Sequence, residues 1–110
     1  MPATVHFRQL SAPWQRLVRL FQSINFGRIE DMEVRSGEPV FSPAPRVLFS
    51  VDLGSDEGAR AEYDLGDFAL PKETVRLMDH LSELGHGTVA LIDVRAGLPR
   101  RLVIDLGVQR

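Results

Sequence analysis

The sequence predicts an α+β fold of two layers, in which an antiparallel sheet of four to five strands carries two helices on one face. Two segments place apolar residues at spacings of three and four, which is typical of amphipathic helices. Each is followed by two apolar segments separated by a short turn that contains Gly, which predicts a β-hairpin. The order helix, strand, turn, strand thus occurs twice, and two such units would share one sheet about a pseudo-two-fold axis.

The first helix is predicted to begin at about Ser11 and to end near Asn25-Phe26-Gly27. Ser11 would be its N-cap, and Pro13 falls in the first turn, where proline is tolerated. One apolar stripe runs along this segment: Trp14, Leu17, Val18, Phe21 and Ile24. Before the helix, residues 4–10 are expected to form a short strand or a tail.

The first strand is predicted over residues 28–35. Ile29 and Met32 are three residues apart, and Val34 follows two residues later. A β-bulge near Glu30-Asp31 would keep all three side chains on one face of the sheet.

A three-residue loop, Arg35-Ser36-Gly37, is expected to end this strand, with Gly in the left-handed conformation. Pro39 cannot donate to a ladder, so it marks a strand start or an edge strand. The stretch FSPAP (residues 41–45) predicts a kink or crossing before the strand of residues 46–53. That strand has one apolar face: Val47, Phe49, Val51 and Leu53.

The second half predicts the same elements. A helix starts around Leu70-Pro71 and ends near Gly85, a good residue to follow a helix C-terminus. Its buried stripe consists of Leu77, Met78, Leu81 and Leu84. A strand over residues 88–95, a turn at 95–97 and a final strand over 100–106 complete the chain.

The two hairpins share a phrase: EVRSGEP at residues 33–39 and DVRAGLP at residues 93–99. Residues 27–39 aligned with 87–99 have five identities, at Gly27, Val34, Arg35, Gly37 and Pro39 of the first copy. Duplication explains this together with the repeated order of elements. The alternative is two unrelated hairpins that met the same turn requirements.

The chain is expected to form a single domain over residues 1–110. Its repeat halves would span about 11–53 and 68–107, joined by an acidic, Gly-rich loop at 54–67. That loop is poor in apolar residues, so it is expected to be exposed and mobile.

The segment INFGRIEDMEVRSGEPV, which follows the first helix, resembles the very small bacterial proteins of the YezD type. The similarity covers about 25 residues, once per half. It implies a unit made of a helix and a β-hairpin, and it implies no activity. The chain departs from that family in its length, its acidic loop and its duplication.

Composition excludes several classes of function. The chain has no Cys, so disulfides, thiolate metal sites and Cys nucleophiles are ruled out. The net charge of −2 is atypical of a dedicated nucleic-acid domain. The N-terminus lacks the apolar region of a secretory signal, and no run reaches the roughly 18 apolar residues of a membrane span. A cytoplasmic protein without membrane contact is expected.

Motifs for catalysis, metals and cofactors are also missing. His80 and His86 are six residues apart, which is not a helical ligand spacing, and His6 is distant in sequence. Gly85-His86-Gly87 follows a helix, where a dinucleotide fingerprint would follow a strand. The acidic loop does not fit a calcium loop, because the required acid falls at Leu53. No catalytic residue, metal or cofactor is therefore predicted.

The best candidate binding residues are four arginines at or beside the hairpin turns: Arg35, Arg95, Arg100 and Arg101. Arg has a planar, forked guanidinium that recognises carboxylates and phosphates, although arginines at turns also serve solubility alone.

The expected function is a small non-catalytic interaction module, or an accessory subunit of a bacterial complex. Open faces and edges of a two-layer fold favour strand addition and dimerisation, so a protein partner or self-association is expected. The alternative is a nucleic-acid-associated protein that uses the turn arginines. A small enzyme or ligand-binding protein is the third hypothesis.

Overall fold

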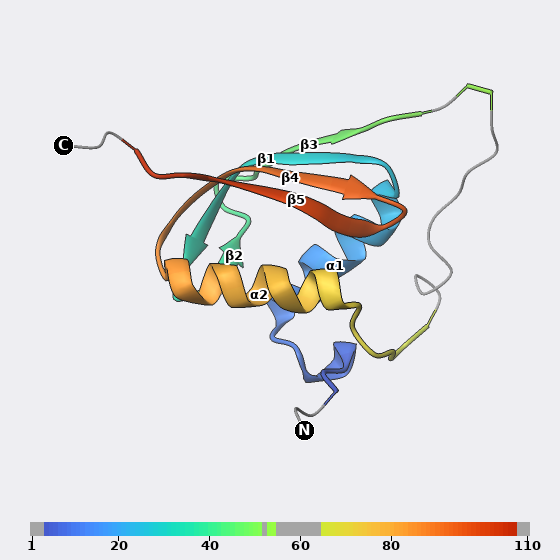
Figure 1. Ribbon diagram of the computed structural model, residues 1–110, viewed down its shortest axis with the longest axis horizontal. Coiled ribbons are helices and arrows are strands. Elements are labelled where there is room, and N and C mark those ends of the chain that lie inside the picture. The colour runs from blue at the N-terminus through green and yellow to red at the C-terminus, as the bar shows by residue number, and fades with distance from the viewer. Residues whose placement is uncertain (1–3, 52, 55–64, 108–110) are drawn as a thin grey trace.

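The computed structural model describes residues 4–51, 53–54 and 65–107. It has two layers, an open five-stranded antiparallel sheet and two helices packed on one of its faces (Figure 1). The predicted fold class is confirmed. Most of the predicted acidic loop lies outside the described residues.

The elements follow one another in the predicted order. They are a 3₁₀-helix η1 (Phe7–Gln9), α1 (Ala12–Ile24), β1 (Gly27–Arg35), β2 (Glu38–Val40), β3 (Arg46–Phe49), α2 (Lys72–Leu84), β4 (Gly87–Arg95) and β5 (Leu98–Asp105). Two expectations were wrong. Residues 4–10 contribute a single bridge, His6 to Ala69, and the turn of η1 in place of a strand. The strand expected to reach Leu53 ends at Phe49.

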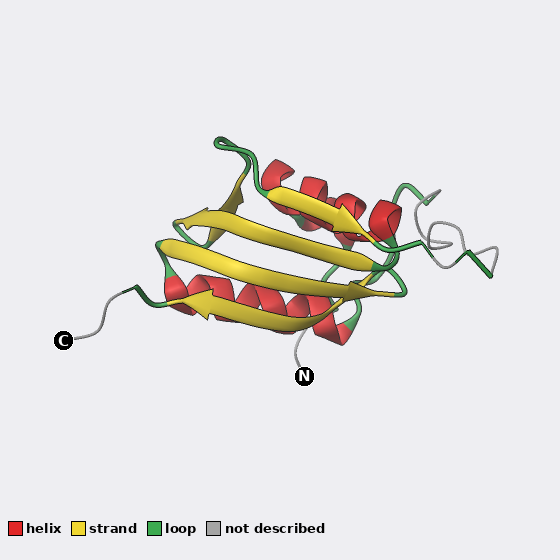
Figure 2. Cartoon of the chain, turned by 90° about the horizontal axis from the view of Figure 1, so that it is seen from above, coloured by secondary structure: helices red, strands yellow, loops and turns green. Residues whose placement is uncertain are grey.

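The sheet has the order β2-β1-β4-β5, and β3 also pairs with β1. β2 lies beside the C-terminal part of β1, and β3 lies beside its N-terminal part (Figure 2). Residues 41–45 separate these two short strands, as FSPAP predicted, because its prolines cannot donate to a ladder. One edge of the sheet is therefore interrupted, and the other is a single eight-residue strand, β5.

Six fully buried side chains form the sheet side of the core: Ile29, Met32, Val34, Val89, Ile92 and Val94. In each of the central strands β1 and β4, the second of these residues follows the first by three positions, and the third follows the second by two. Asp31 has a positive φ of 58°, and this local irregularity turns the chain so that all three residues of β1 face the helices. α1 and α2 cover them with Leu17, Phe21 and Leu81, each of which is buried. Burial of such a side chain stabilises the fold by about 1.5–3 kcal/mol.

Both hairpin loops contain two residues, where three were predicted. Arg35 pairs with Glu38, and Arg95 pairs with Leu98. The loop residues have positive φ angles: 51° and 74° for Ser36 and Gly37, and 53° and 75° for Ala96 and Gly97. Positive φ at both central positions defines the type I′ turn, whose twist matches that of the paired strands.

Each turn is bonded to the end of the helix in the other half. The Gly37 amide donates to the Gly85 carbonyl at 2.8 Å, and the Gly97 amide donates to the Asn25 carbonyl at 2.9 Å. Asn25 and Gly85 are the residues at which α1 and α2 end, both at positive φ. These bonds satisfy a carbonyl that a helix C-terminus otherwise leaves unpaired.

A separate set of contacts holds residues 6–8 to residues 67–69, which precede α2. The Phe7 amide donates to the Phe68 carbonyl, and the two rings stack with centroids 5.0 Å apart. The Arg19 guanidinium lies 4.2 Å from the centre of the Phe7 ring. The Arg8 amide donates to the Asp67 carboxylate at 3.0 Å, and this bond, aided by His6, lowers the pKa of Asp67.

We expect Ala96→Asn to stabilise the protein. Ala pays a steric cost of about 1 kcal/mol at positive φ, and Asn tolerates this conformation better. The free energy of unfolding in urea should rise by roughly 0.5–1 kcal/mol. Ala44→Asn, at an exposed loop position without positive φ, is the control and should change little. A lower urea midpoint for Ala96→Asn would contradict the type I′ turn.

The Asp67 carboxyl should titrate below its ordinary range. Since the folded protein favours the carboxylate, its contribution to stability is complete above the pKa of the unfolded chain and is lost as pH falls through the lowered pKa. NMR titration should give one midpoint for the Asp67 carboxyl carbon and the Arg8 amide proton. Asp67→Asn keeps an oxygen acceptor and should abolish the Arg8 titration. An ordinary Asp67 midpoint would show that the bond does not form in solution.

Candidate protein-interaction edge

The sheet has three outer strands, β2, β3 and β5, and two of them, β3 and β5, differ clearly in how they would meet another strand. An edge strand presents unpaired N–H and C=O groups, and proteins commonly guard it with charges, proline or bulges. β5 has all three: Arg100 and Arg101, Pro99, and a shift in its pairing with β4 near Asp93. None of these occurs in the segment from Val47 to Val51. We call residues 46–51 the β3 edge.

The backbone of the β3 edge points outward at alternate residues. The Ser50 amide donates to the Phe26 carbonyl at 2.7 Å, so Ser50 and Phe26 are a hydrogen-bonded pair. Hydrogen-bonded and non-hydrogen-bonded pairs alternate along an antiparallel ladder. Leu48 therefore also bonds to β1, whereas the N–H and C=O groups of Val47 and Phe49 point away from it. Within the described residues, no strand pairs with that outer side.

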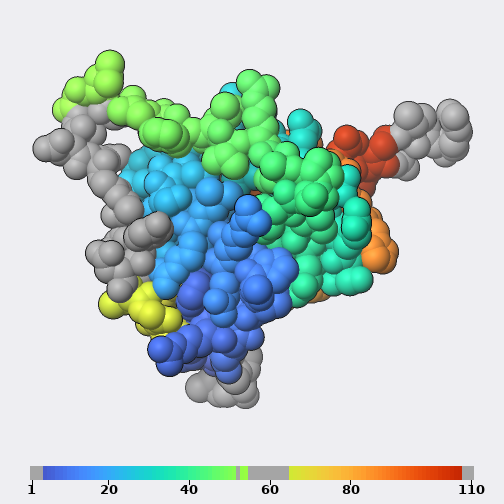
Figure 3. Space-filling model, turned by 180° about the vertical axis from the view of Figure 1, so that it is seen from behind, coloured from blue at the N-terminus to red at the C-terminus, as the bar shows by residue number. Residues whose placement is uncertain are grey.

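An apolar row accompanies these outward groups. Its four side chains are well exposed: Val47 by 41%, Phe49 by 68%, Val51 by 62% and Leu53 by 96%. Val47 lies opposite Ile29 of β1, so this side chain is on the helix side of the sheet. The segment runs along the rim of the molecule and its far end stands off from the body (Figure 3, green). Contiguous exposed apolar surface of this kind marks interaction sites.

Gly27 permits the close approach of β3 to β1. A Cβ atom on Gly27 would lie 2.1 Å from the Leu48 carbonyl oxygen and 2.6 Å from the Phe49 Cα. Both are backbone atoms, which cannot turn away as a flexible side chain can. Because Gly27 has no side chain, the backbone of the β3 edge can pack closely against β1.

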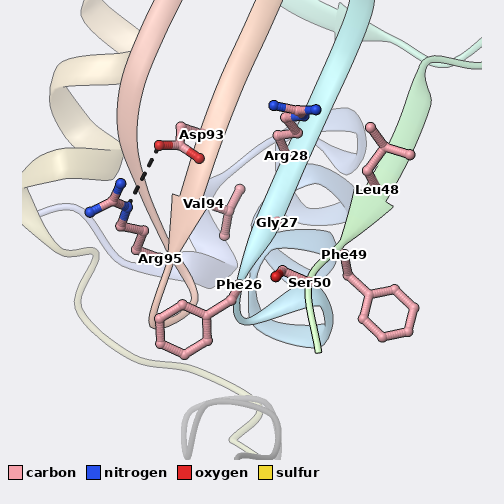
Figure 4. Close-up of a pocket in the computed structure, with 9 residues that line it drawn as sticks. All are labelled: Phe26, Gly27, Arg28, Leu48, Phe49, Ser50, Asp93, Val94 and Arg95. Carbon is pink, nitrogen blue, oxygen red and sulfur yellow. Dashed lines mark ion pairs between the residues drawn. The ribbon is translucent and has the colours of Figure 1, made fainter. Parts of the chain in front are cut away.

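Two hollows flank the β3 edge. One, of about 490 Å³, lies where β1 begins and includes both aromatic and charged side chains. It is lined by Phe26, Gly27, Arg28, Leu48, Phe49, Ser50, Asp93, Val94 and Arg95 (Figure 4). The Phe26 and Phe49 rings project on either side of Ser50, and Arg95 turns toward Asp93, 3.6 Å away.

The second hollow, of about 330 Å³, lies between β3 and α1. Its lining is Arg16, Arg19, Leu20, Ser23, Phe41, Ala44, Pro45 and Val47. Arg16 stacks over Phe41, 4.3 Å from the ring centre. Since Val47 belongs both to this groove and to the apolar row, the groove extends the row toward the helix.

The four arginines predicted to bind do not form one site. Arg35 and Arg95 end β1 and β4, which run antiparallel, with Gly27 opposite Val94 and Val34 opposite Gly87. The two arginines thus lie at opposite ends of the sheet.

Three of the four arginines also have an acidic partner. Their ion pairs are Arg35–Glu33 at 3.3 Å, Arg95–Asp93 at 3.6 Å and Arg100–Glu73 at 3.2 Å. Arg101 lies opposite Asp93 in the ladder. The pair Arg100–Glu73 joins β5 to α2, whereas the pairs on β1 and β4, with Arg28–Glu30 at 3.2 Å, lie on the sheet face away from the helices. That face therefore alternates in charge.

No three His, Asp or Glu side chains among the described residues gather closely enough to hold a metal ion. In the same part of the chain, neither helix has the length and apolar character needed to cross a membrane.

Sequence reasoning found the alternating row but placed it inside a longer strand. The signals for an open edge were present: no charged residue occurs between Val47 and Val51, and residues 41–45 interrupt the strand pattern. What the sequence did not reveal is which side of β3 pairs with β1.

Comparison with protein-family models, curated proteins and solved structures found no match to this chain. The resemblance of each half to YezD-type proteins stays a prediction.

Gly27→Ala should destabilise the protein by about 2 kcal/mol, since a methyl group would push into the β3 backbone. In urea denaturation, the matched control Gly66→Ala should stay within about 0.5 kcal/mol, because the nearest atom to its Cβ is a flexible Arg8 nitrogen at 3.7 Å. Faster hydrogen exchange at Ser50 would report that β3 has moved off β1. Equal stability of the two variants would contradict the close approach.

Proposed function

We propose that this chain is a small non-catalytic protein-interaction module, or an accessory subunit of a complex, that binds a partner by strand addition at the β3 edge. The observation that carries this proposal is the contrast between the two edges. β5 has charges, a proline and a bulge, whereas β3 combines outward backbone groups with an exposed apolar row. Strand addition uses these two features, main-chain hydrogen bonds for affinity and alternate side chains for specificity.

An incoming strand would gain two kinds of contact. Hydrogen bonds to the outward groups of Val47 and Phe49 contribute about 0.5–1.5 kcal/mol each. Its alternate side chains would cover Phe49 and Val51 and enter the groove beside α1, which removes apolar surface from water. The partner expected from this chemistry is an extended segment that is apolar on one side.

The nucleic-acid alternative has less support. Phosphate binding needs arginines whose charge is available along one surface. Arg35, Arg95 and Arg100 each contact a carboxylate, and Arg35 lies away from the other two. The alternative stays a prediction, and a gel shift at low salt tests it directly.

We also propose that the two halves are copies of one unit. The contacts in support are reciprocal: Gly37 bonds to Gly85, and Gly97 bonds to Asn25, so each residue has its counterpart sixty positions away. The pairing of Gly27 with Val94 and of Val34 with Gly87 is reciprocal in the same way. The halves differ at the edges, where residues 41–45 interrupt the first half alone. On this proposal, the interruption adapted one copy for binding.

The proposal is tested with a phage-displayed library of nine-residue peptides, selected on the full chain immobilised at low density. Selected peptides should alternate apolar residues and should bind Val47→Pro at least roughly tenfold more weakly, because the proline ring removes an outward N–H and obstructs an added strand. Val47→Thr keeps that N–H and should lose much less.

The variant Arg35→Ala is a second control, since Arg35 pairs with β2 at the end of β1 away from β3, and it should bind the peptides normally. Selected peptides without alternation, or equal binding by Val47→Pro and Val47→Thr, would refute strand addition.

A further inference from the structure

We infer that the occupant of the β3 edge is a second copy of this chain. Two β3 edges would pair antiparallel about a two-fold axis at Phe49, and the two five-stranded sheets would become one sheet of ten strands. This inference rests on the proposed function and names its partner.

The backbone of the β3 edge is complementary to itself. In the register that sets Phe49 opposite Phe49 of the second copy, Val47 lies opposite Val51 of that copy. Continuing the alternation established by the Ser50–Phe26 bond, the backbone of Val51 points outward as well. All three outward residues then form hydrogen-bonded pairs, and the inward bonds to β1 stay intact.

The side chains match in this register too. Residues on one side of a strand meet residues on the same side of its neighbour, so the apolar row of one copy packs against the apolar row of the other. Arg46 is the only charged residue in the β3 edge. The two copies of Arg46 lie at opposite ends of the paired segment, so no like charges meet.

The groove beside α1 would be filled by the same pairing. Val47 lines that groove together with Leu20, Phe41 and Pro45. Val51 of the second copy, opposite Val47, reaches its mouth. The groove thereby adds apolar contact on both sides of the two-fold axis.

The area available is that of a modest dimer. The apolar row exposes on the order of 400 Å² per chain, within the range of functional surface patches. With the strand backbones and the groove, the buried total comes near the roughly 1,200 Å² at the lower end of specific interfaces. We therefore expect dissociation at micromolar concentrations of the chain.

The two edges also favour an assembly that closes at two copies. If both edges could pair, molecules would join end to end into an open filament. The charges, proline and bulge of β5 disfavour pairing there, and the short strand β2 carries Glu38 and Pro39, so only the two β3 edges join. A contact between identical surfaces about a two-fold axis then leaves no further site.

Sedimentation equilibrium of the full chain between about 1 and 300 µM tests this inference. The mass should rise with concentration from 12.3 kDa toward twice that value. Phe49→Lys should remain a monomer throughout. The matched control is Leu106→Lys, because Leu106 is equally exposed, at 70% against 68%, but lies outside the β3 edge. Circular dichroism should show that both variants are folded.

Cross-linking tests the register, since the chain has no cysteine of its own. Under mild oxidation, a mixture of Val47→Cys and Val51→Cys chains should form a disulfide between the two kinds of chain. Paired residues of adjacent strands have Cα atoms about 5.5 Å apart, within disulfide range. Neither variant alone should cross-link efficiently, because each cysteine lies about four residues from its copy.

A chain that stays monomeric at 300 µM would overturn this inference. A dimer that persists in Phe49→Lys would also overturn it, since another surface would then be responsible. If the monomeric chain still binds displayed peptides and Val47→Pro does not, the proposed strand addition stands and only the second copy is wrong. If neither self-association nor peptide binding occurs, both proposals fail.

Discussion

The antiparallel pairing of β1 with β4 is the constraint on which the rest of the structure depends. Its register aligns Ile29 with Ile92 and Met32 with Val89, so the irregular spacing of apolar residues in each strand is matched by the other. A shift of one residue would move buried side chains to the opposite face, where Asp93 and the arginines lie. The same register brings each hairpin turn to the end of the other helix, where the amides of Gly37 and Gly97 find their acceptors.

The central position of β1 and β4 limits where the sheet can make new contacts. With both central strands occupied on either side and both helices on one face, new contacts form at the outer strands or on the exposed face. The exposed face alternates in charge, which suits solubility and offers no concentrated field of one sign. The strand β3 differs, because it packs closely against β1 at Gly27, its outer side has unpaired backbone groups, and its side chains on the helix side of the sheet are apolar and exposed.

Features that depend on a few neighbouring residues were predicted from the sequence, whereas features that depend on contacts between distant residues were not. Both helices, both hairpins and the spacing of the buried residues around Asp31 follow from patterns a few residues long, because periodicity reports which side chains share a face. The predicted length of the hairpin loops was wrong by one residue, because a three-residue loop and a type I′ turn both accept Gly at the last position. The sequence also does not indicate that Ala96 adopts a positive φ. The candidate arginines do not lie together, for a geometric reason. Equivalent positions in antiparallel strands lie at opposite ends of a sheet, so sequence similarity between Arg35 and Arg95 does not bring them together.

The sequence by itself determined the fold class, the order of the elements and most residues of the core, because each of these depends on hydrophobic periodicity and turn chemistry within a short segment. Only the tertiary structure decided which strands lie at the edges, which side of β3 faces outward, and that Arg100 has a carboxylate partner on α2. Those properties depend on contacts between residues far apart in the chain, such as Ser50 with Phe26 and Arg100 with Glu73. Local patterns do not encode such contacts, since many arrangements of the same elements satisfy the same periodicity.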